Sequence, residues 1–148
     1  MPYNLQPAFV IIGTKADDLT RTQVTLETSY QTDESTEAVK TFEVADYDKL
    51  NLDVFYSTGA GEAGTSVQTI MEGTNDGTNF YRFSNDSTSG ATSTLTQREF
   101  NFVPGAAGNY SYQIPVDVFY KKVRVSFKEA GVSSNAGSVF VEARLKDQ

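Results

Sequence analysis

The fold of this chain is most directly inferred from the stretch Ser66–Phe83, SVQTIMEGTNDGTNFYRF. Its first half alternates along the chain, so that Val67 and Met71 fall on one side, with the period of two that a pleated strand requires. The Asp76-Gly77 pair then interrupts this pattern, and Asp-Gly is a strong hairpin signal because glycine accepts a positive φ without steric cost. The aromatic run that follows suits a half-buried strand. The stretch therefore predicts a strand, a tight turn and a second strand.

The same alternation recurs along the rest of the chain, and no stretch has convincing helical periodicity. About nine or ten short strands separated by polar turns indicate a soluble all-β domain. We expect a two-sheet antiparallel sandwich of jelly-roll type, or a barrel. Besides the opening stretch, the predicted strands are Phe9–Ile12, Thr22–Tyr30, Ala38–Val44, Leu50–Tyr56, Arg98–Val103, Tyr110–Ile114, Phe119–Phe127 and Ser138–Leu145.

Three details of this pattern are specific enough to check. The segment Ser84–Gln97 is rich in Ser, Thr and Gly, and we expect a long loop that is either functional or mobile. Phe119 has the same parity as Val123, so it is predicted to point into the core. Arg124 and Glu142 are predicted to form an outward cross-strand pair.

The 148-residue chain contains neither cysteine nor histidine. The first absence removes disulfides, thiolate metal sites and cysteine nucleophiles, and the second removes the Ser-His-Asp triad and the commonest zinc ligand. Paired acids such as Asp46 and Asp48 lie in turns, where carboxylates are usually solvated. We therefore predict no catalytic residues and no enzyme activity. No apolar run reaches the ~20 residues of a membrane span, and the N-terminus lacks the basic region of a signal peptide.

The net charge of −7 would repel a polyanion such as duplex DNA, so neither a nucleic acid nor a membrane is an expected partner. The charges are distributed unevenly. Residues 15–62 hold most of the acids, and residues 119–148 are predominantly basic. These regions could be complementary patches that meet across a subunit interface, or folding could interleave them into an ordinary mixed surface.

Loop oxygens offer one candidate metal site. Asn75, Asp76, Asn85 and Asp86 could together bind Ca²⁺, but the linear spacing D-x-[DN]-x-[DN]-G is absent. Ordinary turn chemistry explains these residues as well, so no metal site and no cofactor is predicted.

The N-terminal residues 1–14 are expected to form an extended arm, followed by a single β-sandwich domain over residues 15–148. Pro2 and Pro7 disfavour a helix there. The apolar run Phe9–Ile12 either docks on a neighbouring subunit or forms a strand of its own sheet. If it docks, the residues predicted to make this contact are Tyr3, Phe9, Val10, Ile11 and Ile12.

Four segments in order carry a family resemblance: LNLDVFYS (50–57), the opening stretch (66–83), FYKKVRVSF (119–127) and GSVFVEARL (137–145). The chain from about residue 48 to 146 resembles small jelly-roll virion proteins of tailed bacteriophages. Their sheets often carry an "sxDGtnfY" hairpin followed by a "yxxvRVsf" strand. The same pattern appears in discoidin-like carbohydrate-binding modules.

The resemblance implies a structural role in a virion. Proteins of this type are commonly capsid decoration (cement) proteins, often trimers, that bind the outer shell and brace it against internal DNA pressure. It implies the major capsid protein and further copies of this chain, as a homotrimer, as partners. It also implies synthesis in the host cytoplasm and a final position on the capsid exterior. The first alternative is a neck, tail or fibre component.

The second alternative is a carbohydrate-binding module. Its site would be built from loop tips at one end of the sandwich, Ser57–Gly64 together with Ser84–Gln97. Tyr81 or Tyr110 would stack on a sugar ring. The chain has no Trp for this role, which counts against a carbohydrate-binding module.

Overall fold

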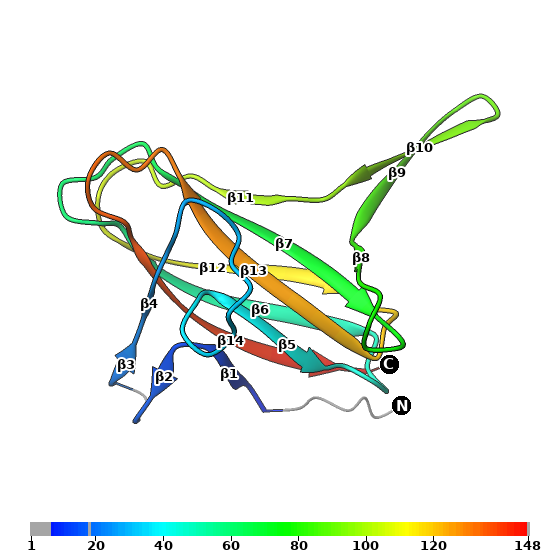
Figure 1. Cartoon of the computed structure of the whole chain (residues 1–148), viewed down its shortest axis with the longest axis horizontal. Helices are drawn as coiled ribbons and strands as arrows, with labels where there is room; N and C mark the ends of the chain where they lie inside the picture. The colour runs from blue at the N-terminus through cyan, green and yellow to red at the C-terminus, as the bar shows by residue number, and fades with distance from the viewer. Residues whose placement is uncertain (1–6, 18, 148) are drawn as a thin grey trace.

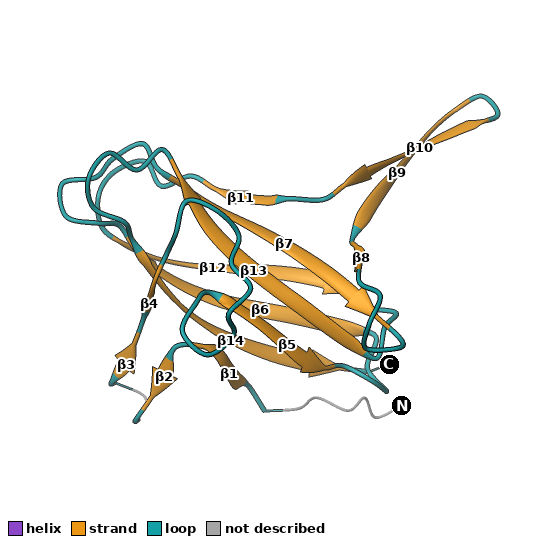
Figure 2. Ribbon diagram, viewed as in Figure 1, coloured by secondary structure: helices purple, strands orange, loops and turns teal. Residues whose placement is uncertain are grey.

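The computed structural model describes residues 7–17 and 19–147, and every regular element in these residues is a β-strand (Figures 1 and 2). The strands are β1 (Phe9–Ile12), β2 (Thr14–Lys15), β3 (Arg21–Thr22), β4 (Val24–Thr25), β5 (Val39–Glu43), β6 (Lys49–Ser57), β7 (Ser66–Thr74), β8 (Tyr81–Arg82), β9 (Ser84–Ser89), β10 (Thr92–Gln97), β11 (Phe100–Phe102), β12 (Asn109–Asp117), β13 (Lys122–Ala130) and β14 (Ser138–Lys146).

Two antiparallel sheets form the body of the protein. The first has the order β1-β14-β6-β12, with β4 also paired to β14, and the second has the order β5-β13-β7-β11, with β8 also paired to β7. From β4 to β14 the strands of the body alternate between the two sheets, except that β7 is followed by β8 and β11 in the same sheet. This is the strand order of a jelly roll. The prediction of an all-β jelly-roll sandwich is confirmed.

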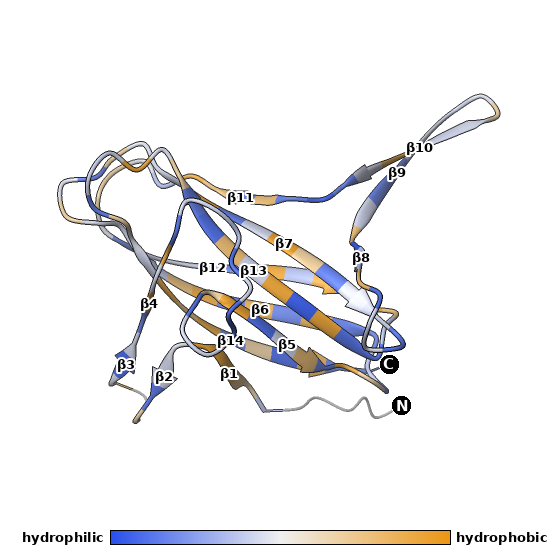
Figure 3. Ribbon diagram, viewed as in Figure 1, coloured by the Kyte–Doolittle hydropathy of each residue, from blue (hydrophilic) through white to orange (hydrophobic). Residues whose placement is uncertain are grey.

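The core lies between the four central strands β6, β14, β7 and β13, each nine residues long. On β6 the inward residues Leu50, Leu52, Val54 and Tyr56 are at most 1% exposed, and the residues between them are half-buried. The bands of alternating hydropathy along β7 and β13 in Figure 3 follow from the same period of two. The sequence pattern therefore predicted these strands and their inward faces correctly.

The N-terminal strand β1 belongs to the protein's own first sheet. Phe9 pairs with Ala143 and Val10 with Glu142 on β14. Ile12 is 2% exposed, and the Phe9 ring meets Phe42 of β5 edge-on with 5.7 Å between centroids. Of the two readings of Phe9–Ile12, the structure shows the strand. Contact between β1 and β5 closes this side of the sandwich.

The segment Ser84–Gln97 is a β-ribbon, so the prediction of a loop is wrong. β9 and β10 pair at six consecutive positions, from Ser84 with Gln97 to Ser89 with Thr92. Gly90 begins the two-residue turn with φ of 62°, the position at which type II′ hairpins place glycine. All twelve strand residues are exposed, and the ribbon projects away from the sandwich (Figure 1, upper right).

The ribbon interrupts an edge strand of the second sheet. The Phe83 amide donates to the Met71 carbonyl at 3.0 Å, and Phe100, seventeen residues later, pairs with Thr69, two residues along the same partner strand β7. The Arg98 amide donates to the Phe83 carbonyl at 2.8 Å and joins the two ends of the insertion. β8 and β11 are therefore two halves of one strand.

Two further predictions are wrong. Arg124 and Glu142 do not pair, because β13 and β14 lie in different sheets; the Nε atom of Arg124 lies 3.1 Å from Glu72, and Glu142 lies 3.5 Å from Lys15. Phe119 is 81% exposed, since regular pairing of β13 begins only at Lys122.

Ion pairs connect the acidic and basic regions of the sequence within one molecule. Lys122 lies 3.6 Å from Glu43, and Lys15 lies 3.5 Å from Glu142. Folding therefore interleaves part of the two charge groups.

Truncating Ile12 should destabilise the protein, because its side chain lies in the core and not on a free arm. We expect Ile12→Ala to lower the free energy of unfolding by about 2–5 kcal/mol in denaturant titrations. The control is Val10→Ala on the same strand, where the side chain is only half-buried and the loss should be clearly smaller. Equal losses in the two variants would contradict the placement of β1.

Gly73 should not tolerate a side chain. A Cβ atom there would lie 2.0 Å from the ring of Tyr120, which itself stacks on Phe83. We expect Gly73→Ala to cost about 1–3 kcal/mol of stability by overpacking. Gly105→Ala is the matched control, because a Cβ atom at Gly105 meets nothing within 4 Å. Thermal unfolding of both variants would show the difference.

Candidate functional site

The predicted contact residues fall into three groups. Tyr3 lies outside the described residues. Ile11 and Ile12 are buried in the sandwich, whereas Phe9 and Val10 are half-buried on β1. A role for these residues in binding the capsid or another subunit stays a prediction, and in this structure only Phe9 and Val10 retain surface for it.

The candidate calcium ligands are not brought together. The Asp76 carboxylate accepts hydrogen bonds from the amides of Thr78 and Asn79, both at 2.8 Å. The bonds from Asn79 and then Thr78 hold the pKa of the Asp76 carboxyl well below its usual range. Asp86 lies on the projecting ribbon. Within residues 7–17 and 19–147, no group of three or more Asp, Glu, His or Cys could hold a metal ion.

The motif residues that carry the family resemblance form a structural brace. The amide of Lys121, just before β13, donates to the Asn75 side chain at 3.0 Å. The guanidinium of Arg124 lies 3.9 Å from the centroid of the Phe80 ring and also binds Glu72. The Asp-Gly turn is thereby fixed to the start of β13. These residues account for the fold, and their contacts do not point to a ligand.

Two buried carboxylates fix the loops at the opposite end of the sandwich. Glu62 accepts hydrogen bonds from the backbone amides of Ser133, Ser134 and Asn135, with the shortest bond at 2.6 Å. These bonds, led by the one from Asn135, lower the pKa of the Glu62 carboxyl. No local sequence pattern predicts this role, because the donors lie about seventy residues further along the chain.

The second of these carboxylates, Glu129, is fully buried. It accepts a hydrogen bond from the Gly137 amide at 2.6 Å and another from the hydroxyl of Tyr56. Burial and then the bond to Glu129 raise the pKa of Tyr56 to about 12, so the phenol remains a donor. Both oxygens of the Glu129 carboxylate accept hydrogen bonds from groups of the protein itself, so this network has a structural role.

The loops proposed for sugar binding lie at opposite ends of the sandwich. Loop 58–65 precedes β7 and the β9–β10 ribbon follows its far end, so roughly 30 Å of strand separates them. Tyr110 stacks on Tyr56, and its hydroxyl donates to the carbonyl of Ala106. Tyr81 is 61% exposed. The expected joint loop site is therefore not formed.

A groove runs along the side of the sandwich opposite β1 and β5. There β12 ends the first sheet and β11 ends the second, and each is paired on one side only. The groove begins with a hollow of about 420 Å³ between residues 99–102 and 112–115. It continues past Pro115 into a hollow of about 540 Å³, and past Arg98 into one of about 240 Å³ at the base of the ribbon. We call the three hollows together the edge groove.

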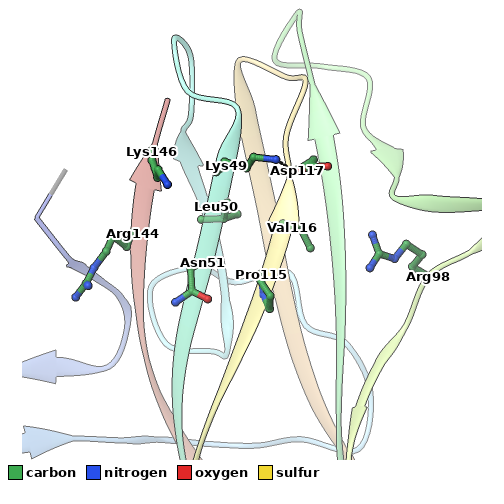
Figure 4. Close-up of a pocket in the computed structure, with 9 residues that line it drawn as sticks. All are labelled: Lys49, Leu50, Asn51, Arg98, Pro115, Val116, Asp117, Arg144 and Lys146. Carbon is green, nitrogen blue, oxygen red and sulfur yellow. Dashed lines mark hydrogen bonds and ion pairs between the residues drawn. The ribbon is translucent and has the colours of Figure 1, made fainter. Parts of the chain in front are cut away.

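The two halves of the edge groove differ in chemistry. The first hollow is lined largely by apolar side chains, including Phe100, Phe102 and Ile114. In the second, Arg98 extends from the segment after β10 toward β12, where Lys49 and Asp117 form an ion pair (Figure 4). Lysines and arginines outnumber acids there on a chain of net charge −7. Composition alone could not reveal this local excess.

The first hollow of the edge groove contains a buried hydroxyl group, that of Tyr112. Tyr112 lines the first hollow, and its ring stacks on Phe102 with centroids 4.2 Å apart. Its hydroxyl makes no hydrogen bond to any described residue. Burial raises the pKa of this phenol, so it stays protonated and can donate.

Comparison with known proteins adds no family. No protein-family model matches the chain, and no curated protein matches its sequence. A search of the described residues for a helix long and apolar enough to cross a membrane found none. At this stage the structure defines the class of protein as a jelly-roll β-sandwich with an inserted ribbon.

Replacing Glu62 should loosen the loop end of the sandwich in a pH-dependent way. A carboxyl whose pKa is lowered on folding stabilises the protein above its unfolded-state pKa, and the effect disappears as pH falls through the folded-state pKa. We therefore expect Glu62→Gln to lower the unfolding midpoint at pH 7 and to matter much less at strongly acidic pH. The control Glu43→Gln, which removes an exposed ion pair, should change little at either pH. A pH-independent loss for Glu62→Gln would contradict this assignment.

Proposed function

We propose that this chain is a structural protein of a tailed-bacteriophage virion, a decoration (cement) protein that binds the outer capsid shell and stabilises it. Its partners would be the major capsid protein and further copies of itself, arranged as a homotrimer on the capsid exterior. The protein would be made in the host cytoplasm and would act mechanically, without catalysis. Many copies, each contributing modestly, would brace the shell.

The observation that carries this proposal is the projecting ribbon. Its twelve strand residues contribute nothing to the core, yet they form a regular hairpin that reaches beyond the body (Figure 1). A lattice protein needs such surfaces, because it must contact neighbours while its own sandwich stays folded. The jelly-roll strand order agrees with the fold that the family resemblance implies.

A neck, tail or fibre component of the same virion is the alternative, since it would use the same fold. The two roles differ in how many copies one particle contains. A lattice-wide decoration protein must be about as abundant as the shell protein, whereas neck and tail proteins occupy one axis of the particle.

The copy number of the chain in purified virions tests the proposal. We expect quantitative mass spectrometry of particles from the virus that encodes it to give a nearly equimolar ratio to the major capsid protein. A handful of copies per particle would favour the neck or tail, and absence from particles would reject both virion roles. Particles lacking the chain provide the control, and they should release their DNA at a lower temperature than complete particles.

A further inference from the structure

The outer edges of the β9–β10 ribbon have the properties of edges that can pair with a further strand. Two-stranded hairpins are at best marginally stable alone in water, and this one has no apolar face against the body. Neither strand carries Lys, Arg or Pro, and the six pairs run without a bulge. Charged side chains such as Lys, prolines and bulges are the features by which natural proteins block free sheet edges, and the ribbon lacks a Lys, a proline and a bulge. The outer edges of the ribbon are therefore open to pairing.

The same chain has a second open edge, on β12. All nine residues of β12 pair with β6, and no described strand pairs with its other side. Asp117 is its only charged residue. Pro115 is its only proline and has no amide hydrogen, so residues 109–114 are the part of the edge in which every amide is present. These six residues extend roughly 20 Å, the same length as the six residues of β10. The β12 edge also borders the edge groove, so a strand added there would have room for its side chains.

We propose that β10 of one copy pairs with the open edge of β12 in a second copy, and that Leu95 enters the apolar hollow of the edge groove there. Leu95 is the one large apolar side chain on the ribbon strands and is 73% exposed. A strand added to β12 directs alternate side chains toward the space between the sheets. Phe100 and Phe102 line that space, which measures about 420 Å³.

The charges of the two surfaces are complementary. Asp86 is the only charged residue of the ribbon strands, and it lies directly across from Leu95 on the same face. When Leu95 is in the hollow, the Asp86 carboxylate lies on the same face of the added strands, and Arg98 lines the adjoining hollows of the groove. Opposite charges of this kind fix the register of an interface.

Both halves of the contact belong to this chain, which is why the partner is a second copy. The ribbon and the β12 edge are different surfaces, so the contact is head-to-tail and closes into a ring when the rotation between copies allows it. A ring of three would satisfy the trimer in the proposed function. The pairing of β10 with β12 of a second copy does not itself require a capsid.

Disulfide trapping tests the contact cleanly because the chain has no cysteine. Thr94→Cys places a thiol on β10 next to Leu95, on the outward face of the added strand. It is mixed in turn with variants that carry one cysteine on the outward face of β12 and is then oxidised. These partners are Asn109→Cys, Ser111→Cys, Gln113→Cys and Asp117→Cys. We expect a disulfide-linked heterodimer on non-reducing gels with at least one of them, since paired strands bring Cα atoms within disulfide reach.

The control partner is Glu43→Cys on β5, which is exposed at the opposite edge of the second sheet. No cross-link with any β12 variant, or an equal yield with Glu43→Cys, would overturn the proposal. Efficient cross-linking of Thr94→Cys to itself would also overturn it, because that result means that ribbons pair with each other.

Sedimentation velocity gives a second, independent readout. We expect the unmodified chain to form oligomers and Leu95→Arg to shift it to monomers. Leu19→Arg, at another highly exposed leucine, should sediment like the unmodified chain. An unmodified chain that stays monomeric, or a Leu95→Arg variant that still associates, would reject the proposed pairing of β10 with β12. Purified protein suffices for both tests, so their failure is distinct from a failure of the virion role.

Discussion

The structure depends on the register of two strand pairs, β6 with β14 and β7 with β13. Each pair runs for nine residues without a slip, and each presents alternate side chains to the same narrow core. A shift of one residue in either pair would turn its apolar set toward solvent. The edge strands of the two large sheets attach to these four strands: β12 and β1 flank the first pair, and β5 and β11 flank the second.

This constraint explains which parts of the fold could be predicted from the sequence. The central strands have one buried face, so their period of two is visible in residues such as Leu50, Leu52 and Val54. The ribbon has no buried face, and its Ser and Thr residues therefore carry no alternation. Its one readable sign is the β-branched Thr residues near Gly90-Ala91, Thr88 before it and Thr92 after it.

Other features depend on long-range pairing and could not be read locally. Arg124 and Glu142 have the spacing of outward residues, but spacing does not say in which sheet a strand lies. Phe119 continues the alternation of its strand, although pairing starts three residues later. The edge groove joins residues from β6, β11 and β12, and only the topology brings them together. The candidate site was therefore unpredictable from composition or motifs.

The two lateral edges of the sandwich, at β1 and β5 and at β11 and β12, differ in how side chains join the two sheets. On one side, the ring of Phe9 against Phe42 joins the two sheets. On the other side, Phe102 stacks on Tyr112 near one end, and the groove opens beyond it. The open side is also where the ribbon leaves the body, so two unusual features lie next to each other.

The clamp at the base of the ribbon has a consequence for how this protein can change. The amide of Arg98 bonds to the carbonyl of Phe83, so the insertion leaves and re-enters its strand at neighbouring points. The sandwich therefore constrains only the separation of these two ends, and closing a longer loop costs little because loop entropy grows slowly with length. The fold of the sandwich therefore does not limit the length or composition of the sequence between them. For the same reason, this position would accept a grafted peptide and present it far from the protein surface.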